Sequence, residues 1–338
     1  MTVPFNPNDA TCCDGIFGLP HTADDAGVIL VPVPFDATTS YRQGTADGPE
    51  TILEASWQVD LRDVETGDPW KHGIVMLPEP EHIVRLNEEA RALAAPIQEQ
   101  EDEEPNEDAL ARVNAISEEV ADWTRGQVEH WLDRNKLVGI IGGDHASPLG
   151  AILALANRNP GLGVLHIDAH ADLRVAYQGF TQSHASIMHN VLERAPGVHR
   201  IAQVGIRDLC DAEMDVIQHS ERVRCWYDND LARAQFEGRT FASMTEEIVA
   251  SLPERVWISF DIDGLDPSLC PNTGTPVPGG LSFQQASYLV GAVARSGRRI
   301  VGFDLCEVAP GIDPTGIDGI VGARILYKLI GWMLLSTK

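Results

Sequence analysis

The segment that decides the fold, residues 163–172, reads GVLHIDAHAD. Its first five residues have the length and composition of a buried strand, and three potential metal ligands, Asp168, His170 and Asp172, follow at once. The same arrangement occurs twice more: LVGII at 137–141 precedes GGDH, and VWISF at 256–260 precedes DID. Because ligands of open α/β sheets bind outside the carboxyl ends of the strands, these groups are expected to meet in one crevice.

The rest of the chain repeats this alternation of apolar strands and helices. Further strands are predicted at 28–33, 200–206, 223–226 and 299–303, and helices at 111–135, 245–251, 282–295 and 317–335, with others starting near 52 and 147. Continuous apolar strands between helices predict an α/β fold whose parallel sheet is covered on both faces.

The domain organisation predicted for the 338 residues is simple. Residues 1–27 form an irregular N-terminal arm, and residues 28–338 form one domain with an acidic insertion near 78–119. Residues 98–108 carry seven acids and no base, which favours a solvated, mobile segment because like charges repel. The six cysteines lack paired metal-ligand spacing and are interpreted as free thiols, and the vicinal pair Cys12-Cys13 has no assigned role.

The net charge limits the classes of partner. With 50 acidic and 25 basic residues the formal charge is −25, which disfavours nucleic acids and anionic membranes and attracts cations. An alternative interpretation is that the charge serves solubility or adaptation to salt. The N-terminus lacks a secretory signal pattern, and charged residues interrupt the apolar stretch 317–335, so a cytoplasmic protein with a buried C-terminal helix is expected.

Charge balance points to two metal ions. Any one strand-end aspartate is commonly a helix cap or a turn residue, but three clusters in one chain are harder to explain that way. Four carboxylates and two imidazoles in one site need about four positive charges, which two divalent cations supply, and water between such ions ionises near neutral pH. Oxygen-rich ligation with imidazole suits Mn²⁺, with Co²⁺, Ni²⁺ or Fe²⁺ as alternatives. The candidate ligands are His145, Asp168, His170, Asp172, Asp261 and Asp263.

The three motifs GGDH, DAHAD and SFDIDGLDP, in this order, resemble those of the ureohydrolase (arginase/agmatinase) superfamily, and the likeness runs from about residue 28 to the C-terminus. The resemblance implies a three-layer α/β/α fold around a mainly parallel eight-stranded sheet. It also implies hydrolysis of a guanidinium or formimino group at a binuclear centre, most often of manganese. One ion would take His145, Asp168, Asp172 and Asp261, and the other Asp168, His170, Asp261 and Asp263.

The resemblance also assigns roles outside the metal ligands. Ser183-His184 resembles the Ser-His-Gly motif of agmatinases, which makes His184 the proton shuttle, with His189 as a nearby competitor. Glu307, in GFDLCEVAP, resembles the glutamate that pairs with the guanidinium, and Thr275 matches a loop beside the active site. Substrate binding is thus expected from Glu307, Ser183 and Thr275. Asp172 would stabilise the tetrahedral intermediate, and Asp263 or His184 would protonate the leaving amine.

The chain differs from the family motifs at residues that bear on the identity of the substrate. Leu173-Arg174-Val175 follow Asp172 where arginases carry an Asn, which argues against arginine, and Ala185 replaces the agmatinase glycine. Arg174 resembles a formiminoglutamase residue and would bind a carboxylate or form a salt bridge, although the Ser-His motif argues against that branch. Tyr177 and Trp257 are candidates for shaping a compact pocket.

The function predicted is an agmatinase-like hydrolase that releases urea and an amine from a small cationic guanidino substrate. Alternatives are a hydrolase of free guanidine, guanidinobutyrate or a biguanide, with nickel in place of manganese, and, from another class, a catalytically silent homologue that serves as a partner subunit. A homo-oligomer, trimer or hexamer, is expected from the resemblance, and a hetero-oligomer stays open.

Overall fold

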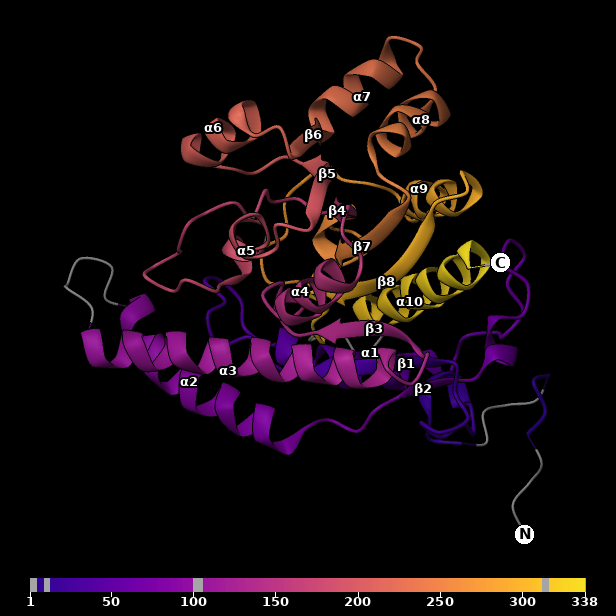
Figure 1. Ribbon diagram of the computed structural model, residues 1–338, viewed down its shortest axis with the longest axis horizontal. Coiled ribbons are helices and arrows are strands. Elements are labelled where there is room, and N and C mark those ends of the chain that lie inside the picture. Colours follow the sequence, from indigo (N-terminus) through magenta and orange to yellow (C-terminus); the bar gives the residue numbers. More distant parts are fainter. Residues whose placement is uncertain (1–4, 9–12, 100–105, 312–315, 338) are drawn as a thin grey trace.

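The computed structural model describes residues 5–8, 13–99, 106–311 and 316–337. One eight-stranded sheet runs through these residues in the order β2-β1-β3-β8-β7-β4-β5-β6, and every neighbouring pair of strands in it is parallel (Figure 1). The strands are β1 Val28–Val33, β2 Ile74–Met76, β3 Leu137–Gly142, β4 Leu162–Ile167, β5 Val198–Ile206, β6 Val223–Tyr227, β7 Arg255–Asp261 and β8 Arg299–Cys306.

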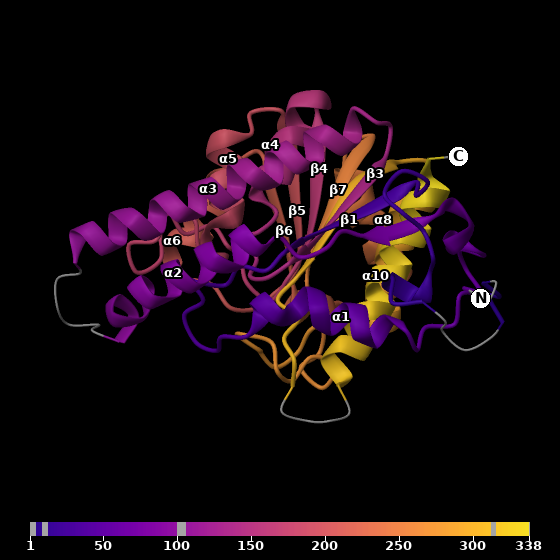
Figure 2. The ribbon, with the colours of Figure 1, turned by 90° about the horizontal axis from the view of Figure 1, so that it is seen from below.

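Helices cover both faces of this sheet, which makes three layers (Figure 2). One apolar cluster joins the sheet to α1 Gly48–Ser56, α7 Asp228–Phe236, α8 Phe241–Ser251, α9 Phe283–Arg295 and α10 Ile317–Ser336. A second cluster joins the other face to α2 Glu81–Glu99, α3 Glu107–Leu132, α4 Leu149–Arg158, α5 Ile187–Arg194 and α6 Asp211–His219. The predicted α/β/α architecture and eight-stranded sheet are therefore confirmed.

The strand predictions agree with the structure for seven of the eight strands, within two or three residues at each end. The eighth, β2, was not predicted because it has three residues at the edge of the sheet, and only Ile74 of them is fully buried. Helix α1 begins at Gly48 rather than near Ile52, since Pro49 in its first turn fixes a helical φ. The amphipathic helices α5, α6 and α7 were also not predicted.

The segment 78–119 is largely helical in the structure. Its helices α2 and α3 pack against each other, and side chains such as Ile83, Ala90 and Val113 are fully buried in the second core cluster. Of the segment 98–108, predicted to be solvated and mobile, residues 98–99 end α2 and residues 107–108 begin α3, which corrects that prediction at both ends; residues 100–105 lie outside the described residues, as does Cys12. Within residues 13–27, Phe17 is buried and its ring packs against Tyr327 at 4.8 Å. The division of the chain at residue 28 stays a prediction.

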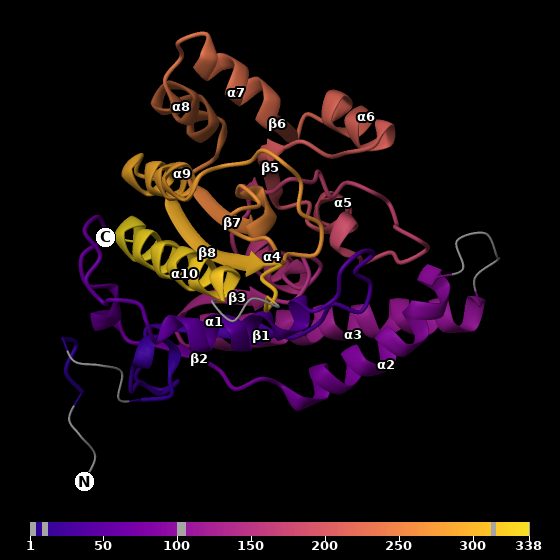
Figure 3. The same ribbon diagram turned by 180° about the vertical axis from the view of Figure 1, so that it is seen from behind.

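The C-terminal helix α10 lies against β8, α1 and α9 (Figure 3). Among the described residues it is the helix with the length and apolar composition to cross a membrane, and 72% of its apolar 18-residue stretch is buried inside the protein. The prediction of a buried C-terminal helix is therefore confirmed.

The topology places the three sequence motifs side by side. Strands β3, β8, β7 and β4 are consecutive neighbours in the middle of the sheet, and all four point the same way. Their carboxyl ends precede His145, Glu307, Asp263 and Asp168, respectively. One edge of the sheet therefore gathers groups that are up to 162 residues apart in the chain, as between His145 and Glu307.

Candidate active site

The site is formed where the four central strands end. Asp168, His170 and Asp172 follow β4 directly in the chain, while Asp261 is the last residue of β7 and Asp263 lies in the short 3-10 turn after it. Two of the site carboxylates, Asp172 and Glu307, have positive φ angles of 55° and 62°. Non-glycine residues rarely adopt this region, and such strain is concentrated at functional sites.

His145 faces three carboxylates with one ring nitrogen. Its Nδ1 lies 2.9 Å from Asp168 Oδ2, 3.1 Å from Asp172 Oδ2 and 3.3 Å from Asp261 Oδ2. On the other side of the ring, Nε2 lies 2.9 Å from Ser259 Oγ. The Ser259 hydroxyl donates to a second acceptor, so it accepts from His145 Nε2–H. Nδ1 is then the ring nitrogen that faces the carboxylates, which is the position from which it would bind a metal ion.

That second acceptor is Asp304, whose Oδ1 lies 3.2 Å from Ser259 Oγ. Asp304 is itself fixed by the indole N–H of Trp257, at 2.5 Å, and by the backbone N–H of Phe260. All of these groups are buried. The sequence makes Trp257 a candidate for shaping the substrate pocket, but in the structure it is buried away from the pocket. It holds the Asp304 carboxylate that orients Ser259.

A second ligand group forms around His170. Its Nδ1 lies 3.1 Å from Asp263 Oδ2 and 3.5 Å from Asp168 Oδ1, so Asp168 belongs to both groups. His166, inside β4, is fully buried, and its Nε2 lies 2.8 Å from Asp168 Oδ2. Gln203 donates to His166 Nδ1, which leaves Nε2–H to donate to the Asp168 carboxylate.

The electrostatics of this cluster fit bound cations. Burial, followed by the charge of Asp168, raises the pKa of Asp172 to about 8, and burial likewise raises the pKa of Asp261 well above its usual value. Burial also acts to raise the pKa of Asp168, but neighbouring imidazoles hold it well below the ordinary range. Without added positive charge the carboxylates cannot all ionise near neutral pH. Oxygen-rich donors, two imidazoles and this shortage of charge suit divalent metal ions.

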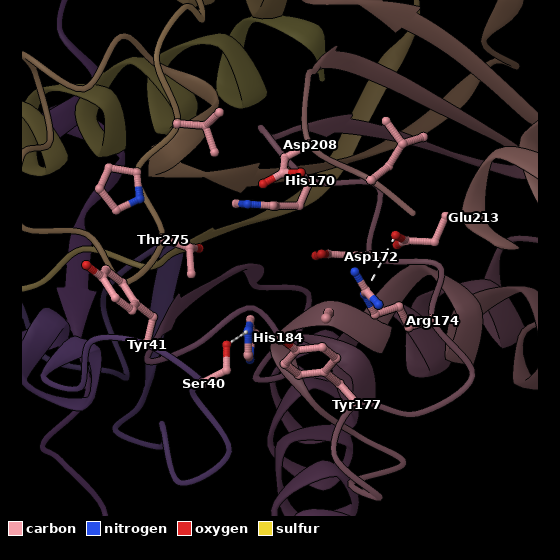
Figure 4. Close-up of a pocket in the computed structure, with 14 residues that line it drawn as sticks. Ser40, Tyr41, His170, Asp172, Arg174, Tyr177, His184, Asp208, Glu213 and Thr275 are labelled. Atoms are coloured by element: carbon pink, nitrogen blue, oxygen red, sulfur yellow. Dashed lines mark hydrogen bonds and ion pairs between the residues drawn. The ribbon is translucent and has the colours of Figure 1, made fainter. Parts of the chain in front are cut away.

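A cavity of about 270 Å³ opens above the cluster (Figure 4). His170, Asp172, His184 and Thr275 line it, and the Thr275 hydroxyl lies 3.4 Å from Asp263 Oδ2. Ser183 does not line it: this side chain is buried, 3.1 Å from Ser186 Oγ. The competitor His189 is also absent from the lining.

Glu307 is not among the residues that line this cavity. The side chain is buried, and its Oε1 accepts from the backbone N–H of His145 at 3.0 Å. Among the described residues Oε2 has no hydrogen-bond partner. A Cβ added at Gly274 would lie 3.2 Å from this oxygen, so the glycine keeps the approach to it open.

The outer part of the cavity holds charged side chains that the motifs do not include. Arg174 Nε lies 3.7 Å from Glu213 Oε2, and its guanidinium lies 4.9 Å from the centre of the Tyr177 ring. The salt bridge considered for Arg174 is therefore confirmed. Asp208 also lines the cavity and is exposed, and no ion pair or hydrogen bond to its carboxylate is found in the part of the chain that the structure describes.

Several of these residues were missed by sequence reasoning. Asp208 follows the predicted strand 200–206 by two residues, so the strand-end argument that found the other carboxylates also applied to it. Ser259 and Asp304 lie inside apolar strands, where a polar residue at a core position is a signal in itself. Ser40, which bonds to His184, comes from a turn-rich loop with no such signal.

The comparisons with known proteins agree with this architecture. Residues 26–331 match the Arginase family. The chain belongs to this family. It is 32% identical to an N(1)-aminopropylagmatine ureohydrolase of Thermus thermophilus, covering 94% of each chain. It is 30% identical to the Synechocystis protein of the same name, over 91% of this chain and 89% of the relative.

The fold is also found in a solved structure, the agmatine ureohydrolase of Thermoplasma volcanium, with a TM-score of 0.73 at 24% identity, covering 95% of this chain and 94% of that one. This arginase-family protein is a hydrolase of C–N bonds in linear amidines that cleaves a guanidino group to urea and an amine. A binuclear divalent metal centre is typical of the family, and a buried His/Asp cluster is present in this chain.

Proposed function

We propose that this enzyme hydrolyses a guanidine that carries a second positive charge, an aminoalkylguanidine of which agmatine is the first to test. The observation that carries the proposal is the charge of the outer cavity. Asp208 has no partner among the described residues, whereas the one basic residue with a formal charge in the lining, Arg174, is next to Glu213. A distal ammonium is therefore attracted by an uncompensated carboxylate.

A substrate with a distal carboxylate fits this wall less well. It would have to draw Arg174 away from Glu213 and approach Asp208, a like charge. The names of the two relatives are consistent with a cationic tail, since N(1)-aminopropylagmatine also carries amino nitrogen beyond its guanidine. The overall charge of −25 further favours a cationic substrate at long range.

The metal ligands in this proposal are the six residues predicted from the motifs. His145, Asp168, Asp172 and Asp261 would hold one ion, and Asp168, His170, Asp261 and Asp263 the other. When bound, divalent ions supply neutralising charge and lower the pKa of water enough to make it a nucleophile near neutral pH. We infer Mn²⁺ from the oxygen-rich donors, and Ni²⁺ is the alternative to test.

Glu307 is the residue proposed to bind the guanidinium. One of its oxygens is satisfied by His145 N–H, and the other is buried without a partner among the described residues. A planar cation with N–H donors supplies the missing bond and is held in one orientation by it. Thr275, which lines the cavity, is proposed to contact the substrate from there. Ser183 is proposed to act from below, since its bond to Ser186 shapes the turn that carries His184.

Proton transfer is needed because an amide anion is too basic to leave when the C–N bond breaks. Burial, followed by the charge of His170, lowers the pKa of His184 to about 4, so the imidazole is neutral near pH 7. A neutral imidazole first accepts the proton released by the nucleophile and then gives it to the departing nitrogen, which is the action of a shuttle. Asp263 is the alternative donor, and Asp172 is proposed to stabilise the tetrahedral intermediate.

A homo-oligomeric assembly, trimer or hexamer, and a cytoplasmic location complete the proposal. Both rest on the resemblance and on the sequence pattern. Size-exclusion chromatography with light scattering measures the assembly directly.

The experiment that tests the function is urea release by protein loaded separately with Mn²⁺ and Ni²⁺. The panel contains agmatine, N(1)-aminopropylagmatine, 4-guanidinobutyrate, arginine, guanidine and a biguanide. We expect the highest kcat/KM for an aminoalkylguanidine with Mn²⁺. Preference for guanidinobutyrate or free guanidine would contradict the assigned substrate class. Two bound metals with no urea from any compound would indicate a catalytically silent homologue that acts as a partner subunit.

A further inference from the structure

The imidazole ring of His184 makes one hydrogen bond among the described residues, and a serine from a distant loop provides it. Ser40 Oγ lies 3.2 Å from His184 Nε2, and both side chains line the cavity (Figure 4). The other ring nitrogen, Nδ1, is buried and has no partner among the described residues. A buried polar atom without a partner is costly, so Nδ1 is the ring nitrogen left to bond a group that enters the site.

The pairing with Ser40 has a consequence for the tautomer of His184. A neutral imidazole carries one donor and one acceptor nitrogen. If Ser40 accepts from Nε2–H, the Nδ1 lone pair is free to accept a proton. If the ring instead carries its proton on Nδ1, this buried N–H lacks an acceptor. Nδ1 then already holds a proton and cannot accept one from the attacking water.

We propose that Ser40 is a positioning residue for the proton shuttle, which holds His184 as the Nε2–H tautomer with Nδ1 open for transfer. This rests on the proposed function. In the step, Nδ1 accepts a proton from the attacking water. It then gives that proton to the leaving nitrogen, which takes the electron pair of the breaking C–N bond. Ser40 itself neither gains nor loses a proton.

The loop that carries Ser40 is fixed from below by a buried carboxylate. Asp36 is fully buried and accepts from the backbone N–H groups of Gly44, at 2.9 Å, and Ala46, at 3.1 Å. Arg91 of α2 forms an ion pair with it. Charge-assisted hydrogen bonds of this kind are among the strongest in proteins, and they close the loop into one shape.

Further contacts hold the loop at its tip. Gln98, also from α2, donates to the carbonyl oxygen of Thr39 at 3.1 Å. On the other side, Arg42 donates to the carbonyl of Pro271, in the segment that leads to Thr275. Helix α2, which the sequence suggested to be part of an insertion, thus holds Ser40 in place, and the hydroxyl is pre-positioned for His184.

The test is a double-mutant cycle on kcat. Ser40→Ala should lower kcat about tenfold with little change in KM, since the substrate does not depend on Ser40 for binding. Ser40→Thr keeps a hydroxyl and should recover most of the rate. In a His184→Asn background, Ser40→Ala should have no further effect, because a residue that acts only through His184 has nothing left to position.

Thr39→Val is the matched control. It removes a hydroxyl from the adjacent residue of the same loop, and that hydroxyl is buried without a partner among the described residues. We expect wild-type kcat. Equal losses in Ser40→Ala and Thr39→Val, an unchanged kcat in Ser40→Ala, or the same loss in the His184→Asn background would each overturn the proposal.

A second readout does not depend on turnover. In ¹⁵N-histidine spectra of protein loaded with diamagnetic Zn²⁺, with His184→Asn used for assignment, wild type should show His184 as a single Nε2–H tautomer. Ser40→Ala should show averaging between tautomers, and unchanged spectra would overturn the proposal. If wild-type protein releases no urea from any guanidine, the proposed function fails, and these spectra still decide whether Ser40 fixes the ring.

Discussion

Two regions of the site differ in how their charges are arranged. The inner cluster, His145, Asp168, His170, Asp172, Asp261, Asp263 and Glu307, lies at the ends of four central strands, and its imidazoles and aspartates contact one another. The outer wall consists of the loop residues Ser40, Tyr41, Arg174, Tyr177 and Asp208, which are more exposed, and of the buried Glu213 at the start of α6. In the proposed function, the strand ends supply the chemistry and the loops are placed to select the substrate.

The largest effect is expected in the inner cluster. Asp168 belongs to both ligand groups, so Asp168→Ala should abolish binding of both metals and lower turnover by at least about a thousandfold, in line with a metal-dependent nucleophile. Metal content by mass spectrometry and urea release are measured on the same samples. Retained activity with two metals per chain would refute the assignment.

Asp266→Ala is the matched control for that variant. Asp266 lies in the same SFDIDGLDP motif, but its Oδ1 accepts from Ser268 rather than facing the cluster. We expect normal metal content and turnover, so an effect as large as that of Asp168→Ala would mean that the motif acts through folding rather than through ligation.

The inner cluster could be predicted from the sequence because each of its members follows an apolar strand in a short motif. The strand Leu162–Ile167 and the ligands Asp168, His170 and Asp172 are adjacent in the chain, so local pattern and site coincide. Glu307 was identified through its motif alone, since nothing in the residues themselves indicates that one of its oxygens is left without a partner.

A smaller effect is expected one contact away from the cluster. Ser259→Ala removes the hydroxyl that accepts from His145 Nε2–H and donates to Asp304, and leaves only the direct Nε2–Asp304 contact at 3.6 Å. Loss of such an outer partner typically lowers metal affinity by about 10- to 100-fold, which calorimetry with Mn²⁺ measures. Ser251→Ala, which removes a hydroxyl bonded to a carbonyl of its own helix, should leave the affinity unchanged. Equal Mn²⁺ affinities for wild type, Ser259→Ala and Ser251→Ala would show that Ser259 does not support metal binding.

Metal binding should also depend on pH. In the metal-free protein the raised pKa values of Asp172, about 8, and of Asp261 mean that protons occupy these carboxylates at pH 6. Cations must displace these protons, so the metal affinity rises as the pH increases toward 8 and falls as the pH decreases. Because the folded state holds protons that the unfolded chain has lost above its ordinary pKa, the metal-free protein becomes less stable as pH rises through this window.

Calorimetry in two buffers with different ionisation enthalpies measures the protons released on metal binding. We expect release at pH 6 and less at pH 8. Binding without proton release at pH 6 would show that the inner cluster is already ionised without cations.

The outer wall could not be predicted in the same way. Ser40 and Asp208 meet in one cavity although they lie far apart in the chain, and no strand motif surrounds Ser40. The role of Arg174 depends on Glu213, which a capping box at the start of α6 places beside it. The neighbours of such loop residues are set by tertiary packing, so a local sequence pattern cannot predict them.

The division between the two regions is tested most directly by kcat/KM for agmatine and for n-butylguanidine, a substrate without the distal ammonium. Both are measured in wild type and in Asp208→Asn. If the outer wall binds the distal ammonium and the inner cluster carries out the hydrolysis, Asp208→Asn should lower kcat/KM for agmatine about tenfold, which is the effect of losing one modest charge-assisted hydrogen bond. The variant should keep its kcat/KM for butylguanidine. Equal losses for both substrates, or none for agmatine, would contradict this division between the two regions.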